Sequence, residues 1–412
     1  MQFREAQLDN GLKIIAEVNP SAATLATGFF ARTGSRDETP NVAGVSHFLE
    51  HMVFKGTARR SAAAVNLAFD EMGANYNAFT SEENTVYFAS VLPEFQASCL
   101  DLLCDILRPS LRQEDFDIEK GVILEEIAMY EDHPHFRLYD NLMSRHFSSH
   151  PLGNVILGSA ESISEMARDD MQAYFDRRYS PTNVTLVGVG NLDFDAMVDQ
   201  ARQMCASWQQ LEASRVAEPS RPVGSRGAIT DAKLTRQNIG LMSQAPSGQD
   251  EQRFAAQILA NVLGDATGSR LYYALVESAL ADDAQMTYSP MDGEGALMTS
   301  VSTDPERAGQ VLGVIDEVFR KFIDEGPGEA ELQAAKNKIA SQATLSGELP
   351  MGRLTSVGFD WVYRSEYVPL ARQIDAMFAV SADDVLTLAQ QCNLQNATLL
   401  TLGPLEKLPE RN

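Results

Sequence analysis

The chain has 412 residues, 44% of them hydrophobic, and a formal net charge of −24 at pH 7. This length favours two domains of about 200 residues each, and the negative charge argues against a nucleic-acid backbone or an anionic membrane as partner. The charge either attracts cationic ligands or only keeps the protein soluble, and both interpretations remain open.

In chain order, the first half shows two strand patterns, two helices, a hairpin and two further helices. They cover residues 11–18, 25–34, 41–56, 61–72, 75–92, 93–108 and 113–134. We expect Asn41 to cap the first of these helices and Gly56 to end it. The hairpin is predicted to turn near Ser81–Asn84. Strands and helices mix without strict alternation, which predicts an α+β fold.

Two segments of the first half recur in the second. The stretch NVTLVGVGNLD from Asn183 agrees with NATLLTLGPLE from Asn396 at five of eleven positions. A helical pattern from Leu92 likewise matches one from Asp304, at nearly the same offset. Two matches in the same order indicate a duplicated domain. We predict homologous domains over 1–212 and 228–412, joined by a linker at 213–227 that is rich in Pro, Ser and Arg.

The N-terminal stretch MQFREAQLDNGLKIIAEV mixes charged and apolar residues, which is not typical of a signal peptide. The sequence has no apolar run of the roughly 18 residues that a membrane span needs. The four scattered cysteines lack a CxxC pair, so we interpret them as reduced core residues. These features predict a soluble, cytoplasmic protein, with no nucleic-acid or membrane partner.

The stretch GVSHFLEHMVFKGT, from Gly44, holds two of the six histidines of the chain. On a helix, His47 and His51 lie one turn apart on the same face, and two neutral imidazoles at that spacing form half of a zinc site. Glu50 lies near the same face, where a carboxylate can take a proton from a metal-bound water. The alternative is a surface helix with two solvated histidines, but the neighbouring residues are largely apolar.

A third zinc ligand is predicted on the helix over 113–132. Helical spacing predicts one apolar face on this helix, made of Phe116, Val122, Ile123, Ile127, Met129 and Tyr130. Glu119 and Glu126 fall within that face, and Glu125 falls on its edge. A buried carboxylate needs a cation or dense hydrogen bonding. Zinc meets that need, and an internal ion pair with an arginine is the alternative.

These motifs resemble the inverted zinc motif of the pitrilysin and insulin-degrading peptidase family. The stretches HFLEHMVFKGT, GANYNAFTSEENTVYFASVL, VILEEIAMYEDHP and HPLGNVILGSAESI resemble the branch that contains mitochondrial processing peptidase and its bacterial relatives. The resemblance covers the first half strongly and the second half more weakly. It implies two αβ-roll-like domains, each a mixed or antiparallel sheet covered by helices.

The resemblance also implies roles for single residues. It makes Glu126 the third ligand of one zinc ion per chain, and Glu119 the glutamate that supports the site. It implies that Asn77, Ala78 and Phe79 form the strand edge to which an extended peptide adds.

The second half has no histidine, and at an offset of 210 residues Gln257, Ala260 and Asn261 fall opposite the zinc motif. We therefore expect a metal-free copy. Relatives commonly carry an arginine and a tyrosine, seven residues apart, where this chain has Val276 and Asp283. The residues that can replace this substrate-anchoring pair are Arg270, Tyr272 and Tyr288.

The sequence therefore predicts a zinc endopeptidase that hydrolyses peptides or unfolded polypeptide segments. One alternative is a non-catalytic or partner-dependent subunit of a processing-peptidase-like heterodimer, and another is a zinc-dependent binding module, which would not need Glu50. Two chains are expected to pair and enclose a chamber, as a homodimer or, alternatively, with a sister subunit.

Overall fold

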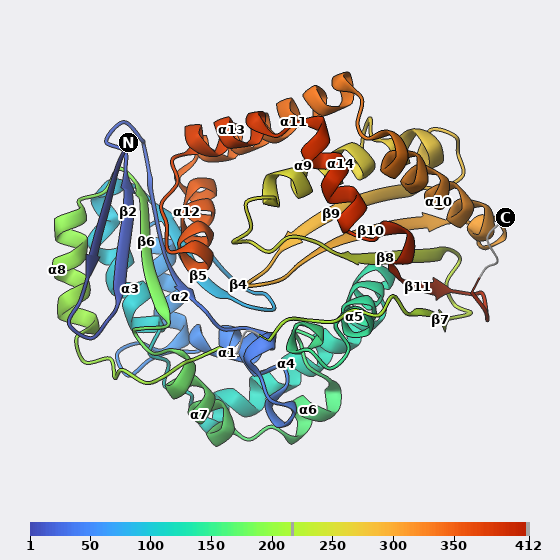
Figure 1. The fold of residues 1–412 in the computed structure, drawn as a ribbon. Coiled ribbons are helices and arrows are strands. Elements are labelled where there is room, and N and C mark those ends of the chain that lie inside the picture. Colours follow the sequence, from blue (N-terminus) through green and yellow to red (C-terminus); the bar gives the residue numbers. More distant parts are fainter. Residues whose placement is uncertain (216–217, 409–412) are drawn as a thin grey trace. The chain divides into compact units, whose positions relative to one another are not determined.

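The computed structural model describes residues 1–215 and 218–408, which form two compact units (Figure 1). The first unit takes in residues 1–128, 154–215 and 344–368. The second takes in residues 129–153, 218–343 and 369–408. Each unit is therefore built from separate stretches of the chain.

The first unit contains a six-stranded mixed sheet in the order β1-β2-β6-β3-β5-β4. The strands are β1 (Gln2–Gln7), β2 (Lys13–Val18), β3 (Leu25–Ala31), β4 (Asn75–Thr80), β5 (Thr85–Val91) and β6 (Val184–Gly190). Only β2 and β6 pair in parallel; the other neighbours are antiparallel. The predicted hairpin is confirmed, because β4 and β5 are joined through Ser81–Asn84.

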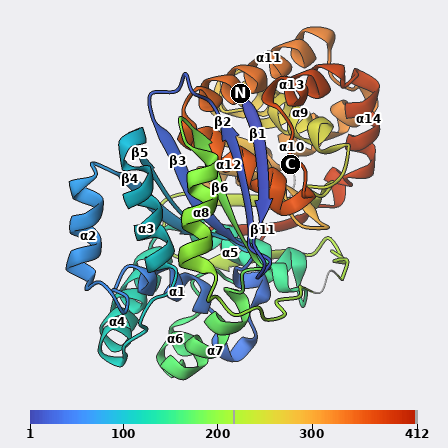
Figure 2. The same cartoon turned by 90° about the vertical axis from the view of Figure 1, so that its left-hand side faces the viewer.

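Helices cover both faces of this sheet. The helices of the first unit are α1 (Val45–Val53), α2 (Ala62–Glu71), α3 (Gln96–Ile106), α4 (Gln113–Glu131, which ends in the second unit), α6 (Ala160–Glu165), α7 (Arg168–Arg178), α8 (Phe194–Cys205) and α12 (Pro350–Arg364). Shorter turns of helix cover Ser35–Asp37, Pro40–Val42 and Pro93–Phe95. Figure 2 shows α3 and α8 on the face of the sheet opposite α12.

Successive residues of β3 belong to different cores because strand side chains alternate between the two faces. Phe29 packs in the large cluster that includes α1, α3 and α8, whereas Phe30 packs with Leu354 and Val357 of α12. Every residue of β3 is buried, as its apolar run predicts for a strand covered on both sides.

The second unit contains a five-stranded mixed sheet in the order β7-β11-β8-β10-β9. Its strands are β7 (Arg226–Thr230), β8 (Gln237–Gln244), β9 (Asp283–Pro290), β10 (Gly295–Thr303) and β11 (Thr398–Gly403). Its helices are α5 (Pro134–Phe147), α9 (Arg253–Gly264), α10 (Ala308–Glu325), α11 (Glu329–Glu348, which ends in the first unit), α13 (Leu370–Ala379) and α14 (Ala382–Gln391). Short helical segments cover Pro151–Gly153, Tyr272–Val276, Pro305–Arg307 and Leu394–Asn396.

The two sheets match strand for strand once β1 is set aside. In both sheets a parallel pair of strands comes first, one antiparallel strand follows, and the two strands of a hairpin come last. In this order β2, β6, β3, β5 and β4 correspond to β7, β11, β8, β10 and β9. The repeated sequence segments form β6 and β11, and α3 and α10. The predicted α+β class with mixed sheets covered by helices is confirmed.

Each unit takes one helix from the other half of the sequence. Helix α12, from the second half, packs on the first sheet, and α5, from the first half, packs on the second sheet through Leu138 and Leu142. The compact units thus differ from the segments 1–212 and 228–412, whose status as domains stays a prediction. Residues 216 and 217 of the predicted linker, and 409–412 at the end of the predicted second domain, lie outside the described residues.

Two smaller predictions can be compared with the structure. Cys99, Cys104, Cys205 and Cys392 are all free thiols in the core, as predicted. Within residues 1–215 and 218–408, none of the helices is both long enough and apolar enough to cross a membrane.

Candidate metal centre

Helix α1 begins after Gly44, and its first turn is held by a buried glutamate. The prediction that Asn41 caps this helix is wrong, because Asn41 lies in the short turn Pro40–Val42 that precedes it. The carboxylate of Glu38 accepts hydrogen bonds from the backbone N–H groups of Gly44 (2.6 Å) and Ser46 (2.7 Å). Glu38 thus satisfies donors that the first turn of a helix leaves unpaired, and its charge suits the positive end of the helix dipole.

Gly44 itself is required by both its conformation and its surroundings. Its φ of 92° lies in the left-handed region, which side chains other than glycine rarely adopt. A Cβ atom there would lie 2.5 Å from the carbonyl oxygen of Leu157. Only glycine therefore lets the chain turn sharply into α1 at this point.

The helix divides its side chains between the core and the site. Its buried apolar residues are Val45, Phe48, Leu49, Met52 and Val53. His47, Glu50 and His51 are partly exposed, with 12% exposure for the His47 side chain and 26% for His51. The two imidazole rings lie 4.7 Å apart, centre to centre, so the predicted convergence of the histidines is present.

Helix α4 brings two glutamates to α1, although its buried face is narrower than the sequence indicated. Val122 and Met129, which were expected on the apolar face, are 44% and 51% exposed. The buried residues are Phe116, Glu119, Ile123 and Ile127. This stripe follows the three-and-four spacing of a helix that packs on one side only, and Glu125 lies outside it, exposed.

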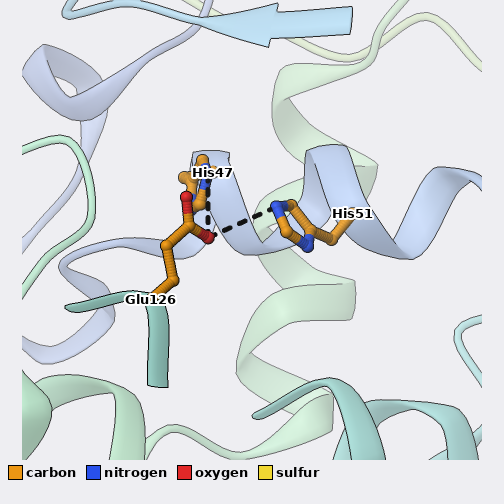
Figure 3. Close-up of side chains that lie close together, drawn as sticks. All are labelled: His47, His51 and Glu126. Carbon is orange, nitrogen blue, oxygen red and sulfur yellow. Dashed lines mark ion pairs between the residues drawn. The ribbon is translucent and has the colours of Figure 1, made fainter. Parts of the chain in front are cut away.

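His47, His51 and Glu126 converge on one point (Figure 3). The Oε2 atom of Glu126 lies 3.8 Å from Nε2 of His47 and 3.7 Å from Nε2 of His51. Ligands about 2.0–2.2 Å from a tetrahedral zinc ion stand about 3.3–3.6 Å apart, so both distances from Glu126 exceed that spacing by only a few tenths of an ångström. Two imidazoles and one carboxylate, with a fourth position free, match the donor set of a catalytic zinc.

Glu119 supports the site from behind. Its Oε1 atom lies 2.8 Å from Nδ1 of His51, and its Oε2 atom lies 2.6 Å from Nζ of Lys55. A proton on Nδ1 would be held by Glu119, leaving Nε2 of His51 with a lone pair for a metal. Glu119 is 2% exposed, so the internal ion pair considered as an alternative does exist, with a lysine rather than an arginine.

The pKa values follow this arrangement. Burial and the adjacent His51 lower the pKa of His47 to about 4, which keeps that imidazole neutral near pH 7. Burial raises the pKa of Glu119, but its hydrogen bonds to His51 and Lys55 outweigh burial and leave it below its ordinary value. Burial also raises the pKa of Glu126, against an opposing effect of the nearby His51.

Glu50 projects from the same helix and has a different partner. Its Oε2 atom accepts a hydrogen bond of 2.6 Å from the hydroxyl of Thr80, at the end of β4. Burial raises the pKa of Glu50, and the hydrogen bond from Thr80 acts in the opposite direction. A carboxylate with a raised pKa beside a potential metal site has the properties of a general base.

The predicted peptide-binding residues lie on β4, which is the last strand of the first sheet. Among the described strands, β4 pairs only with β5, so its other edge is open to strand addition. Asn77 is exposed, Ala78 is buried and Phe79 is partly buried. The N–H group of Ala78 donates to the side chain of Asn77, 2.9 Å away, a bond that an added strand could replace.

Arg270 and Tyr288, predicted to replace the missing arginine–tyrosine pair, lie in the second unit and already have partners there. Arg270 forms an ion pair of 2.8 Å with Glu331 and donates to the carbonyl oxygen of Gly326. The hydroxyl of Tyr288 donates to the carbonyl oxygen of Pro246 at 2.7 Å. These contacts give both residues structural roles, and their contact with substrate stays a prediction.

Three contacts of this centre were not predicted from the sequence. They involve Glu38 at the start of α1, Lys55 beside Glu119, and Thr80 beside Glu50. For two of these contacts the spacing of residues in the sequence gave an indication. Lys55 follows His51 by four residues, about one helical turn, and Thr80 follows Ala78 by two residues, on the same side of a strand.

The chain is similar to known proteins over nearly its whole length. Residues 13–160 match the model of the insulinase family, peptidase family M16, and residues 165–339 match the peptidase M16 inactive domain. An uncharacterized zinc protease of Mycobacterium tuberculosis is 31% identical over 97% of this chain and 93% of its own length. One from Bacillus subtilis is 31% identical over 97% of this chain and 98% of its own.

A solved structure has the same fold. The crystal structure of a protease from Helicobacter pylori matches with a TM-score of 0.91 at 19% identity, over 98% of this chain and 99% of that one. At that level of identity the match supports the architecture, and the chemistry has to be argued from the residues of the site.

Proposed function

Because the chain belongs to the insulinase family of peptidases, family M16, we propose that it is a zinc-dependent endopeptidase. The observation that carries the proposal is the convergence of His47, His51 and Glu126, with Glu50 on the same helix as the two histidines. The zinc-protease names of the relatives support zinc at the level of the family.

The side chains have distinct roles in this proposal. His47 and His51 would hold the ion through Nε2 and Glu126 through a carboxylate oxygen. A bound zinc ion supplies a Lewis acid that polarises the peptide carbonyl and makes water a better nucleophile. Glu50 would take a proton from the attacking water and pass it to the leaving amine. Glu119 would fix the ring of His51 through Nδ1, and Lys55 would hold Glu119 in its charged form.

The substrate would be an extended peptide or an unfolded segment. The open edge of β4 can accept such a chain by strand addition, which reads mainly the backbone and so tolerates many sequences. The net charge of −24 favours cationic segments, unless it serves only solubility.

Two chains would pair to enclose a chamber around the site, and we favour a pair of identical chains. A sister chain that carries the arginine–tyrosine pair is the alternative. Light scattering of the purified protein would distinguish a dimer from a monomer. A zinc-loaded monomer that is inert on a broad peptide library would contradict the homodimer and direct the search to a sister chain. A cytoplasmic location also stays a prediction.

The decisive experiment is Glu50→Gln. This substitution keeps the size of the side chain but removes the base, so the variant should bind about one zinc ion per chain and lose hydrolysis of a peptide library. Zinc content is measured by elemental analysis, and cleavage by mass spectrometry with and without a chelator. A Glu50→Gln variant that remains fully active, or that loses its zinc, would show that the assigned role of Glu50 is wrong.

A second candidate function has one observation in its favour. Residues 165–339 match a domain described as inactive, which is compatible with a subunit that assembles without cleaving. That function does not require Glu50 or the metal ligands to be intact. Purified wild-type protein that binds zinc but cleaves no peptide, alone or with a partner, would support it.

A further inference from the structure

A hydrogen bond joins Thr80 to Glu50 at the candidate metal centre, although the two residues lie on different elements. Thr80 is the last residue of β4, and its Oγ1 atom lies 2.6 Å from Oε2 of Glu50 on α1. An ionised carboxylate can only accept hydrogen bonds, so the hydroxyl of Thr80 is the donor. A bond of this length to a charged acceptor is a strong one.

The position of Thr80 follows from strand alternation. Tyr76, Ala78 and Thr80 are spaced two apart, so their side chains share one face of β4. Tyr76 packs beside Phe54, which directly follows α1, and Ala78 belongs to the core that α1 joins. The side chain of Thr80, the last one on this face, therefore reaches the side of α1 that carries Glu50.

Glu50 would otherwise be poorly fixed. A glutamate has three rotatable side-chain bonds, and a partly exposed one can sample several rotamers. The bond from Thr80 holds the Oε2 atom of Glu50 and leaves Oε1 available for proton transfer. Efficient catalysis needs the base to be within hydrogen-bond distance of the proton that it removes.

We propose that Thr80 is a positioning residue, which orients the carboxylate of Glu50 by donating a hydrogen bond to Oε2. The inference rests on the proposed function. Because Thr80 ends the strand to which the peptide would add, the same strand sets the place of the substrate and the direction of the base. A peptide seated on β4 would then meet a base that is already oriented.

The experiment compares Thr80→Val with Thr80→Ser. Valine has nearly the shape of threonine without the hydroxyl, whereas serine keeps the hydroxyl. We expect kcat to fall about 10- to 100-fold in Thr80→Val, as for other residues that orient catalytic groups. KM should stay within about twofold, and zinc content and melting temperature should stay near wild type. Thr80→Ser should restore most of kcat.

A matched control is Thr27→Val on β3. It makes the same chemical change, and Thr27 donates to the carbonyl oxygen of Val187 in the strand next to it. Thr27→Val should reduce stability without a comparable loss of kcat. Crystals of zinc-loaded Thr80→Val should also show the carboxylate of Glu50 in more than one rotamer, a result that does not depend on activity.

The possible failures are distinguishable. If wild type is active and Thr80→Val keeps its kcat, the inference is wrong and the proposed function stands. The inference is also wrong if Thr80→Val loses zinc together with kcat, if only KM rises, or if Thr80→Ser is as impaired as Thr80→Val. If zinc-loaded wild type is inactive on peptides, the proposed function fails, and this inference fails with it.

Discussion

The two units share one fold, but among the described residues the candidate metal centre lies in the first unit alone. Helices α1 and α9 both follow corresponding strands, β3 and β8, yet α1 carries His47, Glu50 and His51 and α9 does not. At an offset of 210 residues from these three positions, α9 has Gln257, Ala260 and Asn261. The difference shows that the sheet and its helices determine where a site can form, while a few side chains determine whether it does.

The comparison extends to the start of each helix. The first turn of α1 is held by the buried carboxylate of Glu38, whereas α9 begins near Asp250, an exposed residue that accepts from the N–H of Gln252. Helix α1 is thus anchored by a buried carboxyl group, whereas α9 begins beside an exposed one. Four experiments test how far this contrast holds.

The largest effect is expected when α1 is given the residues of α9. In the double variant His47→Gln and His51→Asn, two of the three predicted ligands are lost. Zinc content should fall from about one ion per chain to nearly none, with peptide hydrolysis reduced more than about 1,000-fold. Elemental analysis and a peptide-cleavage assay measure both quantities. The control is Gln257→Ala on α9, which should change neither; a loss of zinc in this control would contradict the contrast.

A smaller effect is expected for Glu119→Gln, because it weakens the support of a ligand and leaves all three ligands in place. Zinc affinity or activity should fall about 10- to 100-fold. Glu125→Gln on the same helix is the matched control, since Glu125 is exposed and should be neutral. Titration with a competing chelator measures the affinity. Equal effects in the two variants would show that Glu119 does not support the metal site.

The third experiment concerns the anchor of α1. Burial raises the pKa of Glu38 to about 7, above its ordinary value of 4.5. A carboxyl group with a raised pKa in the folded state contributes stability below about pH 4.5 that is lost as the pH rises to about 7. Relative to Glu38→Gln, the free energy of unfolding of wild type should therefore fall by up to about 3 kcal/mol over this range.

Urea denaturation at several pH values measures this difference. The control variant is Asp250→Asn near α9, where removal of an exposed carboxylate should change the stability by less than about 0.5 kcal/mol. A difference between wild type and Glu38→Gln that is independent of pH would contradict the titration of Glu38 in this range.

The smallest effect is expected where the helices cross the sheets. A Cβ on Gly358 of α12 would lie 2.2 Å from the ring of Phe30, whereas one on Gly240 of β8 would lie 2.9 Å from the flexible end of Leu142. Gly358→Ala should therefore reduce the free energy of unfolding by about 2 kcal/mol, and Gly240→Ala by less. Thermal and urea unfolding check the order, and a larger loss in Gly240→Ala would contradict it.

Sequence alone predicted the parts of the site that depend on local spacing. The four-residue interval between His47 and His51 is a property of a single helix, so spacing predicted that they converge. Periodicity placed both Glu119 and Glu126 on one face of their helix, and the family resemblance was needed to single out Glu126. The repeat also predicted corresponding strands, because the segments that form β6 and β11 are similar in sequence. The exposed Val122 and Met129 were misplaced, since periodicity groups apolar residues but does not say how much of a helix is covered.

The remaining features depend on contacts between distant segments. Glu38 reaches the first turn of α1 only because Gly44 turns the chain back, and no spacing rule connects Glu38 with Ser46. Thr80 and Glu50 belong to different elements, and their contact appears only when β4 packs against α1. Helices α5 and α12 each pack on the sheet formed by the other half of the sequence. Local sequence does not predict this, because only packing decides which sheet an amphipathic helix covers.

This exchange of helices means that the chain cannot be divided into two self-sufficient pieces. A fragment that ends in the region 213–227 would keep α5 without its sheet, and its own sheet would lack α12 over Phe30. Each fragment would then expose apolar surface that its counterpart covers, so fragments made separately should aggregate. Made together, they should recombine into a single non-covalent particle, which would make this protein a natural case for fragment complementation.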